Sequence, residues 1–450
     1  MNHAAVLLSS ALASAAFVSA AVAQCTPSWD YSLSSPGAAS GYVGALTKYE
    51  GDLIVSGSFT GMGGVANTQY LARLNQGTGA WEPLGAGIGA GISNAFGTSF
   101  AEFQGDLYVG GFFAEAIGVA GTKSIARWDG SAFHSLGTGW GFETVNAVWS
   151  LLSTDAIGGQ ERLYIGGGFD TIAGQPAGCI ASWDGTTLTP LASSMTLVGI
   201  NPLVTCMAVF DDEQGGGPQL YIGGRFSAVN GVPANMIARW NGSTWSAVGT
   251  NLAPRNATAE IDAMLVHDDG TGTALYVGGT NLRLNGDGIN RATAKWDGTT
   301  WTAVGQALTG RTWSLVPFDD GTGTRIYAGG TQAAVGYHYR LEGNTWTAVG
   351  GGTSAQVVKL LVDGNRMHMG GSFTTAGGQT ANRIVSRTSC LVVCGCAADF
   401  NDDGGVDGGD VSAFFEAWEA ATGCSDVNDD GGVDGGDVSA FFSLWEAGGC

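Results

Sequence analysis

The chain has 450 residues, of which 76 are Gly and only 18 are Lys or Arg. So many Gly residues would destabilise long helices, and they follow no strict Gly-X-Y period, so the composition excludes a largely helical protein and a collagen and favours a turn-rich, all-β fold. The formal net charge of -21 argues against a nucleic acid or an anionic membrane surface as partner.

The first segment predicts export. Residues 1–23 are apolar and Ala-rich and end in Ala21-Val22-Ala23, which supplies the small residues that signal cleavage needs. We therefore expect a signal peptide at 1–23 and a secreted or cell-surface protein, with an uncleaved membrane anchor as the alternative. Beyond Ala23 no apolar run is long enough to cross a bilayer, so we expect no membrane span in the mature chain.

A repeated unit organises the chain from residue 43 to residue 390. Each unit contains a short apolar run that ends in Gly, usually Gly-Gly, and the seven runs are at 53–57, 107–111, 163–167, 220–224, 275–279, 326–330 and 367–371. The steps between them are 54, 56, 57, 55, 51 and 41 residues. A unit of this length holds about four short strands, which is one propeller blade. We therefore predict an all-β, seven-bladed β-propeller over residues 24–390.

The strands within a unit follow from its apolar runs and turns. In one unit we expect an inner strand at 261–266, a second strand at 275–279, a third at 292–296 and a fourth at 301–304. Asp-Gly or Asn-Gly turns join the third strand to the fourth, as at Asp297. We expect the Trp that opens the fourth strand to pack between neighbouring blades, at Trp81, Trp245, Trp301 and Trp346.

The seventh unit lacks a Trp-led fourth strand, and a matching piece around Trp29 precedes the first inner strand. We therefore predict that residues 25–35 supply the outer strand of the last blade and close the ring. Cys25 and Cys390 would then lie close together, where a disulfide would lock the closure. Export makes disulfides feasible for all eight Cys, which allow about 105 pairings, so the sequence alone does not choose among them.

The amino-acid sequence of the repeats also resembles that of a known family. Leu-Tyr-Ile-Gly-Gly-Arg-Phe at 220–226 is followed by Ile-Ala-Arg-Trp-Asn-Gly-Ser-Thr-Trp at 237–245. These runs resemble the kelch-like propeller units of secreted bacterial proteins and of fungal cell-surface proteins. The resemblance covers about 350 residues and implies the fold, because such propellers host unrelated activities.

The last 54 residues, 397–450, hold thirteen Asp or Glu and no Lys or Arg. Two near-identical twelve-residue runs begin at 399 and 426. They have acidic or amide side chains at positions 1, 3, 5, 9 and 12 and a Gly carbonyl at position 7, which are the positions where a calcium loop needs oxygen ligands. We therefore predict two calcium ions. The ligands are Asp399, Asn401, Asp403, the Gly405 carbonyl, Asp407 and Asp410 in the first loop, and Asp426, Asn428, Asp430, the Gly432 carbonyl, Asp434 and Asp437 in the second.

Each loop leads into an amphipathic helix, with apolar residues at Val411, Phe414, Phe415 and Trp418 and again at Val438, Phe441, Phe442 and Trp445. We expect these aromatic residues to form a small core between the helices, with a partner-binding face as the alternative. The duplicated loop and helix, with Gly-Cys before each loop, resemble a type I dockerin. The resemblance implies a calcium-binding module at 397–450, joined by a linker at 391–396, which docks onto a cohesin-like or other surface-anchoring protein.

Catalytic motifs are scarce. His134, His267, His338 and His368 fall in different units, so we interpret them as surface or strand residues, and no nucleophile elbow or phosphate loop with Lys is present. A carbohydrate or protein ligand would meet the loops after the second strands, where Arg225, Arg283 and Arg291 could contact an acidic sugar or form surface salt bridges. We expect a non-enzymatic binding or scaffold protein. The alternative is a carbohydrate-active enzyme, a glycoside hydrolase or lyase, with two facing carboxylates in the central channel.

Overall fold

The computed structural model describes residues 27–89, 96–136, 147–172, 175–305, 308–331, 337–389, 398–400, 406–419, 425, 427 and 433–447. Within these residues the chain forms seven main antiparallel sheets, which we number in chain order by their inner strands. The predicted signal peptide, Cys25, Cys390 and the linker lie outside the described residues.

The first four sheets each contain four strands. They are β2 (Val43–Tyr49), β3 (Asp52–Gly57), β4 (Leu71–Asn75) and β5 (Ala80–Pro83); β6 (Phe96–Phe103), β7 (Asp106–Phe112), β8 (Ile125–Trp128) and β9 (Phe133–His134); β10 (Val148–Thr154), β11 (Arg162–Gly167), β14 (Ile180–Trp183) and β15 (Leu188–Pro190); and β17 (Leu203–Phe210), β18 (Gln219–Arg225), β21 (Ile237–Trp240) and β22 (Trp245–Ala247).

The last three sheets follow the same plan. They are β24 (Glu260–Asp268), β25 (Thr273–Leu284), β26 (Arg291–Trp296) and β27 (Trp301–Ala303), with β23 (Leu252–Pro254) also paired to β25; β28 (Thr312–Asp319), β29 (Thr324–Gly330), β30 (His338–Glu342) and β31 (Thr345–Ala348); and β32 (Val357–Asp363), β33 (Arg366–Gly371), β36 (Ile384–Thr388) and β1 (Ser28–Asp30).

Short elements complete the described strands and helices. They are the 3-10 turn η1 (Ser32–Ser34), the pair β12 (Thr171–Ile172) and β13 (Gln175–Pro176), the trio β16 (Met195–Thr196), β19 (Ala228–Val229) and β20 (Val232–Pro233), the pair β34 (Thr375–Ala376) and β35 (Gln379–Thr380), and the helices α1 (Gly408–Glu419) and α2 (Gly435–Ala447).

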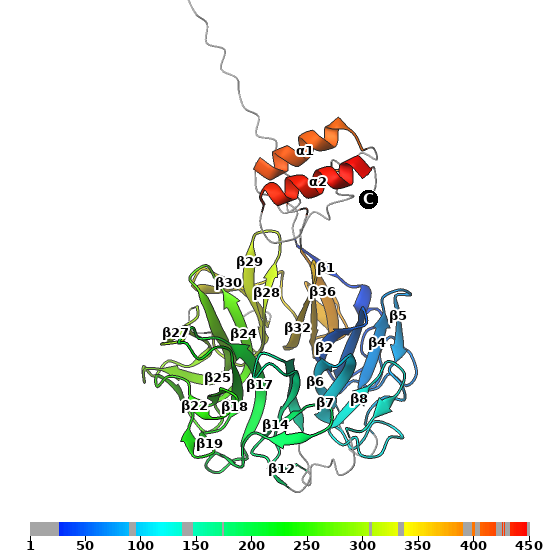
Figure 1. Cartoon of the computed structure of the whole chain (residues 1–450). Helices are drawn as coiled ribbons and strands as arrows, with labels where there is room; N and C mark the ends of the chain where they lie inside the picture. Colours follow the sequence, from blue (N-terminus) through cyan, green and yellow to red (C-terminus); the bar gives the residue numbers. More distant parts are fainter. Residues whose placement is uncertain are drawn as a thin grey trace, which may run out of the picture.

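The seven inner strands, β2, β6, β10, β17, β24, β28 and β32, form a closed ring. Each inner strand contacts the inner strand of the next sheet, and β32 of the seventh sheet contacts β2 of the first. Figure 1 shows the sheet colours passing around this ring in chain order. The core lies between neighbouring sheets: Tyr108 of the second sheet, for example, shares a buried cluster with Leu163 of the third. Sheets packed in this way around a common centre are a β-propeller.

The N-terminal segment pairs with the last sheet. In β1, Trp29 lies opposite Arg387 of β36, so residues near the start of the chain provide the outer strand of the seventh sheet, as expected. The Trp29 indole N–H donates to the Gly350 carbonyl at 2.8 Å. This contact repeats a bond that Trp301 makes to the Val248 carbonyl at 2.8 Å, between the fifth and fourth sheets. Trp29 therefore takes the place of the missing fourth-strand Trp.

Each inner strand carries a β-bulge at the same place. The register against the second strand skips one residue in all seven sheets, and these bulge residues are Gly44, Thr98, Trp149, Thr205, Asp262, Trp313 and Val358. A bulge bends its strand and re-aims a side chain, and here it brings an inner-strand carbonyl close to the second strand. A Cβ on Gly224 would lie 2.1 Å from the Leu203 carbonyl oxygen. The second Gly of the repeated pair is therefore required by the bulge.

The first Gly of the pair serves the contact between sheets. A Cβ on Gly370 of the seventh sheet would lie 2.6 Å from Cγ1 of Val43 in the first sheet, and one on Gly166 would lie 2.7 Å from Cγ1 of Val204. Because no side chain fits there, neighbouring sheets approach closely at this position.

One expectation needs correction. Cys179 and Cys206 are buried free thiols, so the prediction of disulfides is wrong for these two residues. The other six Cys lie outside the described residues. Of the histidines, His338 and His368 are fully buried strand residues, 0% and 2% exposed.

The two C-terminal helices pack through their aromatic residues, as expected. Phe414 of α1 and Phe441 of α2 are fully buried, and their rings stack with centroids 4.2 Å apart. Phe400 meets both rings edge-on, at 5.5 and 6.0 Å. No helix in the described part of the chain is long and apolar enough to cross a membrane.

Candidate functional site

The described C-terminal carboxylates lie where the two helices begin, in matching positions. Asp410 and Asp437 are 0% exposed in the first turns of α1 and α2. The backbone N–H of Asp407 donates to Asp410 at 2.6 Å, and that of Asp434 donates to Asp437 at 2.8 Å. The side chains of Asp407 and Asp434 in turn each accept a backbone N–H two residues further on, at 2.7 Å. The two halves thus have the same local geometry.

Each half also supports the other. The Trp418 indole on α1 donates to the Asp434 carbonyl at 3.0 Å, and the Trp445 indole on α2 donates to the Asp407 carbonyl at 2.9 Å. Together with the stacked Phe rings, these reciprocal bonds join the last turns of each helix to the start of the other, so the two helices run antiparallel.

The described members of the predicted calcium ligands fit a hard cation. Asp399 is only 9% exposed, Asp410 and Asp437 are fully buried, and all donors are oxygen atoms. The segment 397–450 itself contains no Lys or Arg. The remaining predicted ligands, Asn401, Asp403, Gly405, Asp426, Asn428, Asp430 and Gly432, lie outside the described residues. Among the residues that are described, no three acidic, His or Cys side chains gather closely enough to hold a metal.

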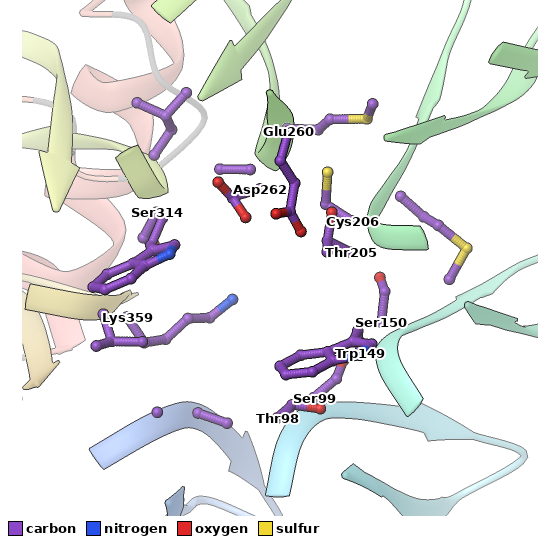
Figure 2. Close-up of a pocket in the computed structure, with 18 of the residues that line it drawn as sticks. Thr98, Ser99, Trp149, Ser150, Thr205, Cys206, Glu260, Asp262, Ser314 and Lys359 are labelled. Carbon is purple, nitrogen blue, oxygen red and sulfur yellow. The ribbon is translucent and has the colours of Figure 1, made fainter. Parts of the chain in front are cut away.

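A second candidate site occupies the centre of the propeller. A cavity of about 660 Å³ follows the inner strands, and all seven bulge residues line it, as do the residues that follow them: Ala45, Ser99, Ser150, Cys206, Ala263, Ser314 and Lys359. This volume is within the usual range of roughly 300 to 1,000 Å³ for a small-molecule site. Figure 2 shows Lys359, Trp149, Glu260 and Asp262 pointing toward a shared open space. We call this cavity the channel site.

Arg311 ties together the two carboxylates of the channel site. Its guanidinium binds both oxygens of Asp262, with Nε 2.8 Å from Oδ2, and Nη2 lies 3.1 Å from Oε2 of Glu260. Glu260 also faces Arg225 at 4.0 Å. Burial raises the pKa of Asp262 to about 7, although the Arg311 charge acts against that shift. The two carboxylates come from one strand, β24, and bind one cation, so they do not face each other from opposite sides of the channel.

Lys359 differs from its counterparts in the other six sheets. At its position they carry Ala, Ser or Cys. Lys359 is half-buried because the channel reaches it, yet desolvation by the surrounding protein lowers its pKa. In the described part of the chain its ammonium has no hydrogen bond or ion pair, while Arg311 beside the same cavity is fully engaged.

The Thr residues at the bulges have structural partners. The hydroxyl of Thr98 donates to the Val148 carbonyl of the next sheet, and that of Thr205 donates to the Ile261 carbonyl. Two Ser hydroxyls accept instead: Ser99 takes the Leu151 N–H at 2.9 Å, and Ser314 takes the Leu360 N–H at 3.1 Å. Neighbouring inner strands are thus bonded to each other along the channel.

The three Arg residues expected on the loop face lie in different surroundings. Arg225 lines the channel site. Arg291 forms a salt bridge with Asp287, with Nη2 2.6 Å from Oδ2, which is the surface ion pair considered as the alternative. The Nε of Arg283 is buried and has no hydrogen-bond partner among the described residues. The structure therefore does not bring the three together. The central channel was considered from the sequence, but its lining residues, such as Lys359, were not predicted because the bulges that turn them inward were not recognised.

Comparisons with known proteins are limited to shape. No family model matches the chain, and no curated protein matches it. Among solved structures, it is similar to the extracellular domain of a putative hybrid two component system from B. thetaiotaomicron, with 12% identity and a TM-score of 0.48 over 81% of this chain. That match spans 39% of the other chain. It is also similar to YCF48 from Cyanidioschyzon merolae, with 12% identity and a TM-score of 0.44 over 81% of this chain and 99% of that one.

Proposed function

We propose that this chain is an exported binding or surface-scaffold protein, in which a seven-bladed, kelch-like propeller carries the ligand site and residues 397–450 form a calcium-dependent, dockerin-like anchor. The observation that carries the proposal is the matched pair of helix starts, each with a fully buried Asp and each held by the Trp of the other helix. Residues 397–450 contain thirteen Asp or Glu and no Lys or Arg, so a bound cation would offset the negative charge gathered at these helix starts.

The cation is calcium in this proposal, because the predicted loops offer only oxygen ligands at the spacing of a twelve-residue calcium loop. When bound, calcium supplies the positive charge that both loops lack. The protein's own part is to aim its carboxylates inward and to fix the helices that would face a partner.

Calcium titration of the chelator-treated full chain tests the anchor. We expect two sites per chain by calorimetry, and we expect Asp410→Asn and Asp437→Asn each to remove one of them. Glu416→Gln is the matched control, since Glu416 is an exposed carboxylate on α1 and should leave both sites intact. No heat above background for the wild type, or two sites in either Asn variant, would contradict the proposal.

Capture from the organism's surface extract tests the partner. Immobilised full chain should retain a cohesin-like or other surface-anchoring protein in calcium and release it in chelator, and a double Asp410→Asn, Asp437→Asn variant should retain none. Equal capture by wild type and double variant would place the interaction elsewhere in the chain.

The channel site favours binding over glycoside cleavage. Hydrolysis needs two carboxyl groups on opposite sides of the scissile bond, about 5 to 10 Å apart. Among the channel-lining residues that the structure describes, the carboxylates are Glu260 and Asp262, and both bind Arg311. A carbohydrate-active enzyme is therefore the weaker reading.

A further inference from the structure

The starting point is the single Lys359 among seven equivalent positions. The bulge repeats in every inner strand, and the residue after it is Ala, Ser or Cys in the other six sheets. A small residue therefore suits this backbone. A long, charged side chain here costs desolvation, as the lowered pKa of Lys359 indicates, and gains no ion pair within the described residues. A desolvation cost that no ion pair within the described residues offsets indicates that Lys359 pairs with a bound ligand.

The charge of the channel site fits an anion. Its lining includes three basic residues, Arg225, Arg311 and Lys359, and two acidic ones, Glu260 and Asp262, so its formal charge is +1 in a chain of net charge -21. Arg311 already binds both acidic side chains. Arg225 lies 4.0 Å from Glu260, so among the described lining residues Lys359 is the cation without an ion pair and is available to a ligand.

The walls of the cavity fit a sugar ring. Trp149 lies at a bulge and is half-buried, so its ring presents an apolar surface to the channel. Ser150 follows it, and within the described residues its hydroxyl bonds to no protein atom. Ser99 and Ser314 only accept a backbone N–H in the described structure, so their hydroxyl hydrogens can point into the channel. An aromatic wall with several hydroxyl donors suits a ligand with one apolar face and many oxygens.

A peptide is the less suitable ligand. A peptide strand would need free backbone groups along an inner strand. Several of those groups are already used, because Leu151 and Leu360 donate to Ser hydroxyls and Val148 accepts from Thr98.

We infer that the channel site binds a carboxylate-bearing sugar, with Lys359 pairing its carboxylate and Trp149 packing against its ring. This inference rests on the propeller being the ligand-binding part of the proposed function, and it names the ligand class.

Calorimetry on the full chain tests it with three probes: sodium glucuronate, glucose as the neutral sugar, and sodium acetate as the carboxylate without a ring. We expect glucuronate to bind at least about tenfold more tightly than glucose or acetate. Lys359→Met, which keeps the length of the side chain, should weaken glucuronate at least about tenfold and leave glucose unchanged. Lys359→Ser restores the residue type of the other sheets and should fold normally with the same loss. Lys123→Met is the matched control outside the channel and should bind as the wild type does.

Each outcome decides the inference. Unchanged glucuronate binding by folded Lys359→Met and Lys359→Ser overturns it, and so does glucose binding as tightly as glucuronate. If acetate binds as tightly as glucuronate, the inference that the ligand is a sugar is overturned and the channel site is a simple anion site. The test is repeated with the double variant Asp410→Asn, Asp437→Asn: glucuronate binding should persist there, so a failed anchor and a failed channel site give different results.

Discussion

Replacing the buried His338 should make the propeller more tolerant of acid. His338 begins β30, is 0% exposed, and neither ring nitrogen has a hydrogen-bond partner within the described residues. Its ring stacks on Tyr327 at 5.6 Å and meets Trp29 of the closing strand edge-on at 6.3 Å. Burial, with help from the positive charge of Arg387, lowers the pKa of His338 to about 3.

The sign and size of the effect follow from the difference between folded and unfolded states. The unfolded chain takes up a proton at this residue below its ordinary pKa of about 6.5, and the folded chain does not. The stability is therefore fully present above about pH 6.5 and is lost as the pH falls toward 3. The value pH 5 lies about 1.5 units below the ordinary pKa of His. At roughly 1.4 kcal/mol per unit, the stability lost at pH 5 is therefore about 2 kcal/mol. That is a large part of a typical stability of about 5 to 15 kcal/mol.

His338→Phe keeps an aromatic ring and removes the titration. We expect its free energy of unfolding, measured by urea with tryptophan fluorescence, to fall about 2 kcal/mol less than that of the wild type between pH 8 and pH 5. The comparison between the two proteins matters because other groups titrate too: the pKa of buried His368 is also lowered, and the raised pKa of Asp262 acts in the opposite direction. Any packing cost of the larger Phe appears at both pH values and cancels. Equal acid losses in the two proteins would refute the reasoning.

Three further predictions concern the propeller. Gly224→Ala should prevent stable folding or cost several kcal/mol, because its Cβ would lie 2.1 Å from the Leu203 carbonyl oxygen, whereas Gly61→Ala, with open space around it, should leave the urea midpoint unchanged. Trp301→Ala should destabilise by about 3 to 5 kcal/mol in the same assay, since the ring is 2% exposed, and a loss under 1 kcal/mol would show that the ring does not join the sheets. In the wild type, Asp262 should cost stability as the pH rises from about 4 to about 7, because its pKa is higher in the folded chain than in the unfolded chain, and Asp262→Asn should abolish this loss. If wild type and variant change in stability equally between about pH 4 and about pH 7, the raised pKa is contradicted.

The strand plan was predictable because it depends on local and repeated signals. Each of the seven Gly-ending runs lies in the second strand of its sheet, and the unit expected at 261–304 forms β24 to β27. The bounds agree within two residues except for β25, which continues to Leu284, five residues beyond the expected end. The N-terminal strand was also predictable, because the seventh unit lacks a fourth-strand Trp and Trp29 precedes the first unit without belonging to any other. Periodicity and turn residues decide these features over short distances.

The channel site was not predictable in the same way, because it depends on which side chains a bulge turns inward. An alignment of the inner strands offered one signal: Val-Trp-Ser-Leu at 148–151, Ile-Asp-Ala-Met at 261–264 and Val-Val-Lys-Leu at 357–360 vary widely at their second and third residues while the others stay apolar. The bridge from Arg311, which directly precedes β28, to the carboxylates of β24 carries no such signal, since it depends on the distance between two sheets.

The bulge positions also separate stability from recognition. Thr98 and Thr205 bond the next sheet from these positions, so replacing them would loosen the ring. Trp149 and Lys359 also face the channel, but Lys359 has no hydrogen bond or ion pair in the described part of the chain, so its charge holds no two sheets together. A propeller of this kind can change its ligand by substituting residues of the second group while the repeated Gly pairs and Trp contacts keep the ring closed. We therefore expect variants of Lys359 to alter ligand affinity with little change in unfolding midpoint, and variants of Thr98 to do the reverse.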